Sequence, residues 1–160
     1  MIKADQLREF RPTYRFQDGS EITLATIQGI LTEAAESMEI PVSFERDEVK
    51  SGGLFNSQVD DCLVLYHPDH PNDYYRFCIT VRKQGTMAFI AVNDFGNSKQ
   101  LKKINTQEFM KQDRKGKQMS YKVGSMIGQS LRTLGMDKNA IAYEQNYYSA
   151  LVSIFDELIS

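Results

Sequence analysis

Residues 74–95 read YYRFCITVRKQGTMAFIAVNDF, and this stretch decides the fold. From Tyr75 to Arg82 apolar side chains occupy every second position, which is the period-two pattern of a strand with one buried face. Gln84-Gly85 supplies a turn, because glycine readily adopts a positive φ angle. Met87 to Val92 then forms the return strand. The sequence therefore predicts an antiparallel hairpin.

The sequence does not determine the register of this hairpin. A two-residue loop would set Val81 opposite Ala88 and Ile79 opposite Ile90, whereas a three-residue loop would turn the return strand over. The return strand is apolar on both faces, so its residues are compatible with either register. A strand of this kind indicates a sheet that is covered on both sides, by helices or by a partner.

Three further elements precede the hairpin. Cys62-Leu63-Val64-Leu65-Tyr66 is a continuous apolar run, which is typical of a strand covered on both faces. Residues 42–49 are predicted to form a short polar strand at the edge of the sheet. Apolar residues recur at spacings of three and four from Ile27 to Met38, which predicts a helix capped by Thr23 or Ser20.

The remainder of the chain is predicted to be mainly helical. One helix runs from Tyr121 to Leu134 and stops at a glycine. Asp137 caps the last helix, which extends from Lys138 to Leu158. Because the link between these two helices is short, we expect them to pack as an antiparallel pair.

Together these elements predict one α+β domain over residues 1–160. In this fold an antiparallel sheet of about four strands, within residues 42–95, packs with an N-terminal helix and a C-terminal helical hairpin. The composition agrees, since 41% of the residues are hydrophobic and 25% are charged, as in ordinary globular proteins. A chain of 160 residues can also bury a sizeable core without disulfide bonds.

The expected location follows from the apolar runs and the cysteines. No run approaches the roughly 18 apolar residues that a membrane helix needs. The N-terminus carries charges where a signal peptide requires an apolar stretch. Cys62 and Cys78 lie within apolar strands, where cysteines in a reducing compartment behave as small buried hydrophobic residues. We therefore expect a cytoplasmic protein that makes no membrane contact.

The charge is distributed unevenly along the chain. The formal net charge is −2, but residues 99–122 alone carry +6, which leaves −8 for the rest. Such a segment can neutralise the phosphates of DNA or RNA, and it fits an acidic protein partner equally well. A charge run is also commonly just a solvated face. The candidate binding residues are Lys99, Lys102, Lys103, Lys111, Arg114, Lys115 and Lys117.

Both histidines of the chain lie in one short turn before the hairpin. Together with Asp69 and Asp73, His67 and His70 have the side chains of a divalent metal site, or of a general acid and base. Two histidines on one loop leave a metal under-coordinated, however, and a proline-rich turn explains the same residues without any chemistry. A metal site at His67 and His70 is thus the weaker interpretation.

The last helix has an apolar band wider than that of a typical surface helix. One interpretation is a central helix that is buried against both the sheet and a neighbouring helix. The other is that part of the band serves as an oligomer interface, most simply with a second copy of the chain. Under that hypothesis the interface residues are Tyr147, Tyr148, Leu151 and Phe155.

These observations favour a non-enzymatic binding or regulatory module that acts through protein–protein contacts, including self-association as a homodimer. One alternative is a nucleic-acid-associated protein that uses the basic segment 99–122. A second alternative is a small hydrolase or nuclease centred on His67 and His70. No residue pattern calls for a cofactor.

Overall fold

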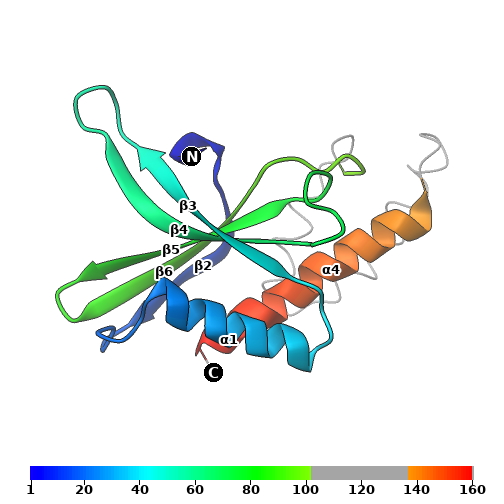
Figure 1. Ribbon diagram of the computed structural model, residues 1–160, viewed down its shortest axis with the longest axis horizontal. Coiled ribbons are helices and arrows are strands. Elements are labelled where there is room, and N and C mark those ends of the chain that lie inside the picture. Colours follow the sequence, from blue (N-terminus) through cyan, green and yellow to red (C-terminus); the bar gives the residue numbers. More distant parts are fainter. Residues whose placement is uncertain (102–136, 160) are drawn as a thin grey trace.

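A computed structural model describes residues 1–101 and 137–159 (Figure 1). The chain begins with strand β1, a short 3-10 turn η1, strand β2 and helix α1. Four strands and, after residues 102–136, the C-terminal helical segment follow. The elements are β1 (Ile2–Lys3), η1 (Ala4–Gln6), β2 (Arg8–Phe16), α1 (Leu24–Ser37), β3 (Ser43–Ser51), β4 (Gln58–Tyr66), β5 (Arg76–Gln84), β6 (Met87–Phe95), α4 (Lys138–Asp156) and η3 (Glu157–Ile159).

The six strands form one mixed sheet in the order β1-β3-β4-β5-β6-β2. The prediction of about four antiparallel strands was therefore wrong in number and in type. The additional strands come from the N-terminus, where β1 runs parallel to β3 through Ile2 and Val49. β2 contains Pro12 and pairs with β6 at the opposite edge, where a proline is tolerated.

The sheet is strongly curled. β1 and β2 lie at opposite edges of the six strands, yet only residues 4–7 separate them. Neighbouring strands are about 4.8 Å apart, so a flat sheet would place these edges roughly 24 Å from each other. The connection spans at most about 17 Å when fully extended. The two edges must therefore approach one another at this end.

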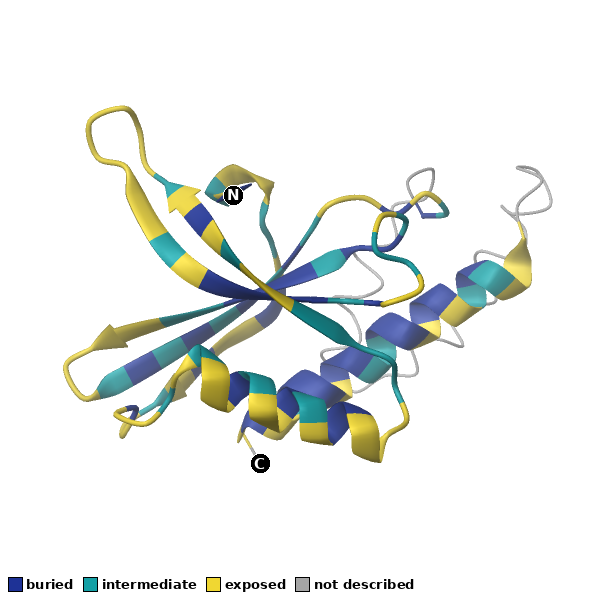
Figure 2. Cartoon of the chain, viewed as in Figure 1, coloured by how far each residue is buried: buried dark blue, intermediate teal, exposed yellow. Residues whose placement is uncertain are grey.

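Helices α1 and α4 both pack against one face of the sheet and form the main core (Figure 2). Thr23 caps α1 and Asp137 caps α4, so both predicted helices are confirmed with their N-caps. The predicted helix 121–134 lies outside the described residues, and the helical hairpin stays a prediction. The α+β class is confirmed. Within the described part of the chain, no helix is both long and apolar enough to cross a bilayer.

The β5–β6 hairpin has a different register from the one expected for a turn at Gln84-Gly85. Its loop is Gly85-Thr86, with φ +62° at Gly85, so Val81 lies opposite Ile90. The pairing is displaced by two residues from the predicted two-residue loop. A shift of two residues leaves every side chain on its predicted face.

The second face of the sheet carries a smaller apolar cluster. Ile2, Val49, Cys62, Val64 and Cys78 are buried there. Since Leu63 and Leu65 are buried on the helix-covered face, the prediction that this strand is covered on both sides is confirmed. Both cysteines are free thiols.

Candidate functional site

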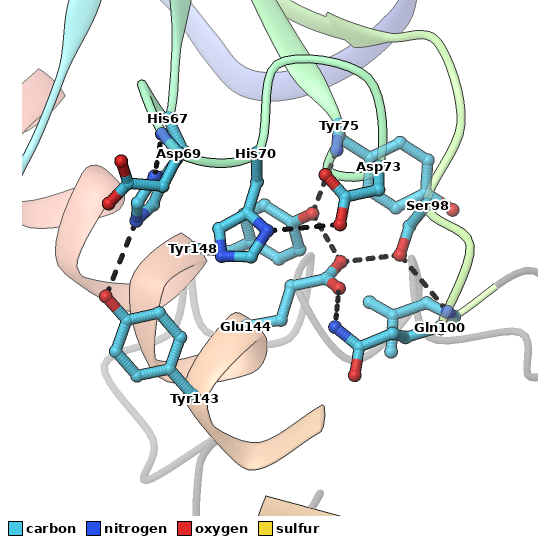
Figure 3. A network of polar contacts seen from close by, with 11 residues as sticks. His67, Asp69, His70, Asp73, Tyr75, Ser98, Gln100, Tyr143, Glu144 and Tyr148 are labelled. Atoms are coloured by element: carbon cyan, nitrogen blue, oxygen red, sulfur yellow. Dashed lines mark hydrogen bonds and ion pairs between the residues drawn. The ribbon is translucent and has the colours of Figure 1, made fainter. Parts of the chain in front are cut away.

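The two predicted histidines lie at the end of the sheet where β4 stops and β5 begins, facing α4 (Figure 3). They belong to a cluster of aromatic and polar side chains. The ring centroids of His67 and His70 are 4.8 Å apart, and His70 stacks on Tyr74 with centroids 4.0 Å apart. The fold thus brings His67 and His70 of the turn next to side chains of α4.

His67 is almost fully buried, with 2% of its surface exposed. Its Nδ1 accepts a hydrogen bond from the Asp69 backbone N–H at 3.1 Å, so the ring proton lies on Nε2. Nε2 is 3.4 Å from the hydroxyl of Tyr143. Burial, and then the proximity of His70, lower the pKa of His67. This imidazole is therefore neutral and engaged at both nitrogens.

His70 is half-buried and pairs with Asp73, with 3.1 Å between Nδ1 and Oδ2. The histidine and carboxylate of this pair are three residues apart on the same turn. Within the described ranges 1–101 and 137–159, no group of three or more His, Cys, Asp or Glu side chains could hold a metal ion. The turn thus contains a histidine–carboxylate pair. Such a pair occurs in turns with a structural role as well as in proton-transfer sites.

Sequence reasoning missed Glu144, which occupies the centre of this region. It is fully buried on α4. Its carboxylate accepts hydrogen bonds from the hydroxyls of Ser98 at 2.6 Å and Tyr148 at 2.5 Å, and from the side-chain amide of Gln100 at 3.1 Å. The signal was a carboxylate within the apolar stripe of the last helix, three residues after Ile141 and four before Tyr148.

The network around Glu144 fastens three segments of the chain. The hydroxyl of Tyr148 also accepts the backbone N–H of Tyr75 at 2.9 Å, at the start of β5. The hydroxyl of Ser98 accepts the N–H of Leu101 at 3.1 Å, after the end of β6. Desolvation by burial raises the pKa of Glu144 to about 7, although the Ser98 and Tyr148 hydroxyls oppose this shift. The arrangement is that of a buried polar clamp between sheet and helix.

Most of the predicted basic segment lies outside the described residues. Of its candidate residues only Lys99 is described; it is exposed, and its backbone N–H donates to the carbonyl of Asp73 at 3.2 Å. Nucleic-acid binding by residues 99–122 therefore stays a prediction. The residues outside the described ranges are Lys102, Lys103, Lys111, Arg114, Lys115 and Lys117.

The four residues predicted as an oligomer interface are buried within the chain. Tyr147 is 4% exposed, and Tyr148, Leu151 and Phe155 are fully buried. The ring of Phe155 packs against Phe10 and Phe77 of the sheet. This placement matches the other interpretation of the apolar band, a central helix buried against the sheet. It leaves these four side chains no surface for a partner.

The opposite end of the sheet is open. β3–β4 and β5–β6 are each paired along their whole length, from Ser43 to Tyr66 and from Arg76 to Phe95. β4 and β5 pair with one another only at Leu63–Ile79, Val64–Cys78 and Leu65–Phe77. Figure 1 shows the two hairpins diverging from this junction. We call the opening between residues 58–62 of β4 and residues 80–84 of β5 the fork.

A cavity of about 360 Å³ lies at the fork, on the face of the sheet opposite the helices. Its lining comes from β3 and β4 on one side and from β5 and β6 on the other, with further residues from η1 and β2. An ion pair with 3.1 Å between Arg82 Nη2 and Asp60 Oδ2 bridges the two sides. The remaining lining residues are Ala4, Leu7, Thr13, Val49, Ser51, Thr80, Phe89, Ala91 and Asn93.

No pattern in the sequence indicates the fork, because the fork results from strands that fail to pair. Each strand is individually recognisable from its pattern, and the pattern contains nothing about where pairing to a neighbour stops.

Neither a family model, nor a curated protein, nor a solved structure matches this chain. We therefore infer its function from the residues of the chain itself.

Proposed function

We propose that this protein is a non-enzymatic binding module that acts through protein–protein contacts, and that the fork is its contact surface. The observation that carries the proposal is the divergence of β4 from β5 after only three paired positions. A continuous sheet would have closed this region with further backbone hydrogen bonds. Instead the two strands end in separate hairpins with a cavity between them.

The tip of the β3–β4 hairpin supports the proposal. Leu54 and Phe55 are adjacent in the loop, and each is 97% exposed. Aromatic and large apolar side chains are the usual anchors of protein interfaces. A single exposed apolar residue is unremarkable, but here two stand together at the end of a projecting arm. They extend the contact surface beyond the cavity.

The histidine cluster gives less support to the hydrolase alternative. Both nitrogens of His67 are engaged, and the carboxylate of Glu144 is enclosed by its three donors. A catalytic acid or base has to reach a substrate atom within hydrogen-bond distance. Of the two imidazoles, that of His70 is the one with appreciable exposure. The carboxylate that it contacts, Asp73, lies on the same turn.

Site-specific photo-crosslinking tests the proposal. A photoreactive phenylalanine analogue replaces Phe55 at the hairpin tip or Phe89 in the cavity, in cells of the natural source. The same analogue at Ala25, an exposed position of α1, is the matched control. We expect defined protein adducts at Phe55 and Phe89 and none of the same mass at Ala25.

The masses of the adducts separate the possible partners. An adduct of twice the chain mass would identify a homodimer, and any other discrete mass would identify a different protein. Both results support protein binding through the fork. Absence of adducts at both Phe55 and Phe89, or the same adducts at Ala25, would show that the fork is not a contact surface.

A further inference from the structure

The strands beside the fork have backbone groups that point into the opening. In a hairpin with a two-residue loop the closing pair, here Gln84 and Met87, exchanges both hydrogen bonds. Alternate residues of an antiparallel strand then direct their N–H and C=O groups to opposite sides. On β5 the groups of Thr80 and Arg82 therefore face β6, and those of Val81 and Lys83 face the fork.

The same alternation applies to β4. The alternation that directs the backbone groups of Val81 and Lys83 into the fork directs those of Ile79 towards β4. Leu63 lies opposite Ile79, so the backbone groups of Leu63 face β5. Because the period is two, Val59 and Asp61 also direct their N–H and C=O groups into the fork. No pairing partner for these positions occurs on the β5 side among the described residues. Such an edge is a template for another strand.

The cavity limits the side chain that an added strand can place there. Its apolar lining comes from Leu7, Val49, Phe89 and Ala91, with hydroxyl and amide groups beside them. The two charged residues of the wall, Asp60 and Arg82, neutralise one another. An additional charge would gain no partner in the cavity and would lose its hydration. The lining thus favours an uncharged apolar side chain.

Charge disfavours a second copy of the chain that pairs two-fold with the fork. Two-fold pairing of the β5 edges would bring Arg82 and Lys83 against the same residues of the other copy. Pairing of the β4 edges would do so for Asp60 and Asp61. Like charges directly opposite one another destabilise a strand pair, and natural sheets use them against self-association.

We infer that the fork binds an extended segment of a different protein, which adds as a strand along β5 and places an uncharged apolar side chain in the cavity. This inference rests on the proposed function and specifies its ligand. Backbone hydrogen bonds supply the affinity, and the cavity selects one side chain among alternate residues, as in other strand-addition complexes.

A pair of variants at Lys83 separates the backbone contribution from the side chain. Lys83→Pro removes an N–H that faces the fork while sparing the hydrogen bonds between β5 and β6. Lys83→Ala removes the side chain, including its 3.1 Å contact to the carbonyl of Ser20, and keeps the N–H. Lys83 is exposed near the hairpin turn, so both variants should fold; thermal unfolding checks this.

The probe is a phage-displayed library of random dodecapeptides, selected on the full chain. Selected peptides are synthesised with a fluorescent label and titrated by anisotropy. We expect alternating apolar residues in the peptides, binding about tenfold weaker to Lys83→Pro, and a change within about twofold for Lys83→Ala. Methylation of peptide N–H groups should weaken binding at every second position only.

Three outcomes of the peptide experiment would overturn the inference. They are failure to select any peptide, equal binding to the Lys83→Pro and Lys83→Ala variants, and insensitivity of the peptides to N-methylation. Photo-crosslinking at Phe89 to a copy of the same chain would also contradict it. In each case discrete adducts at the fork would leave the proposed function standing, whereas their absence would remove both.

Discussion

The two ends of the β4–β5 pair differ in how they use polar groups. At the end facing α4 the carboxylate of Glu144 accepts three hydrogen bonds, and Tyr148 continues the network to the backbone of Tyr75. At the fork the backbone groups of Val81 and Lys83 have no strand opposite them among the described residues. One end is closed by buried contacts, and the other is left available.

This difference distinguishes polar groups that stabilise the fold from polar groups that are available for binding. A buried polar group is expensive unless it is hydrogen-bonded, so a completed network mainly specifies how the chain folds. Backbone groups at an accessible strand edge stay hydrated at little cost and can exchange water for a partner. A cluster of histidines, tyrosines and a glutamate suggests a functional site when only the sequence is known, yet in the structure it belongs to the core. The less conspicuous strand edges are the better candidates for recognition.

The largest expected effect concerns the junction between the two ends. Ile79 is fully buried and lies opposite Leu63, the last position at which β4 and β5 pair before the fork. Ile79→Asp places a charge without a partner in the core and should cost about 5 kcal/mol or more, comparable to the whole stability of a domain. We expect loss of the cooperative unfolding transition followed by circular dichroism.

The matched control is Ile30→Asp on α1, where the side chain is 37% exposed. This variant should remain folded, with a free energy of unfolding within about 1 kcal/mol of the wild type. Soluble, cooperatively folding Ile79→Asp protein would show that this junction does not hold the two hairpins together.

A smaller effect is expected at the closed end and depends on pH. The pKa of Glu144 rises from an ordinary value of 4.5 to about 7 in the folded chain. Folding therefore retains a proton that the unfolded chain releases, so this residue reduces stability as pH rises from 4.5 to 7. Above pH 7 the loss is constant, on the order of 3 kcal/mol.

Glu144→Gln provides the comparison for this effect, because glutamine does not titrate. Denaturant unfolding of both proteins between pH 4.5 and 8 gives the difference in free energy of unfolding, which cancels the titration of other groups. The wild type should lose stability relative to Glu144→Gln up to pH 7 and then run parallel to it. A difference that is constant from pH 4.5 would mean that Glu144 is ionised throughout.

The features that the sequence predicted correctly are local ones. Thr23 and Asp137 precede helices whose apolar residues recur at helical spacing, so cap and helix can be read from a few neighbouring residues. The buried face of the β5–β6 hairpin follows from alternation in the same way. Its register did not, because moving the turn by one position changes no side chain's face.

The features that the sequence did not reveal depend on contacts between distant segments. β1 has two residues and is a strand only because β3 lies beside it. Glu144 acquires its role from Ser98, which is 46 residues away. The candidate histidines were identified, but their burial and partners depend on how α4 packs. Periodicity describes which residues face inward and does not say what they meet there.

The smallest expected effect on stability lies at the tip of the β3–β4 hairpin, in the double variant Leu54→Ser with Phe55→Ser. Because both side chains are 97% exposed, the free energy of unfolding should change by less than about 0.5 kcal/mol. Leu65→Ser, at a fully buried position, should by contrast cost about 3 kcal/mol. The double variant should nevertheless weaken the adducts formed by the photoreactive analogue at Phe89. If stability falls as far as in Leu65→Ser, Leu54 and Phe55 belong to the core. If the adducts persist unchanged, the hairpin tip contributes nothing to binding and the contact surface is confined to the cavity.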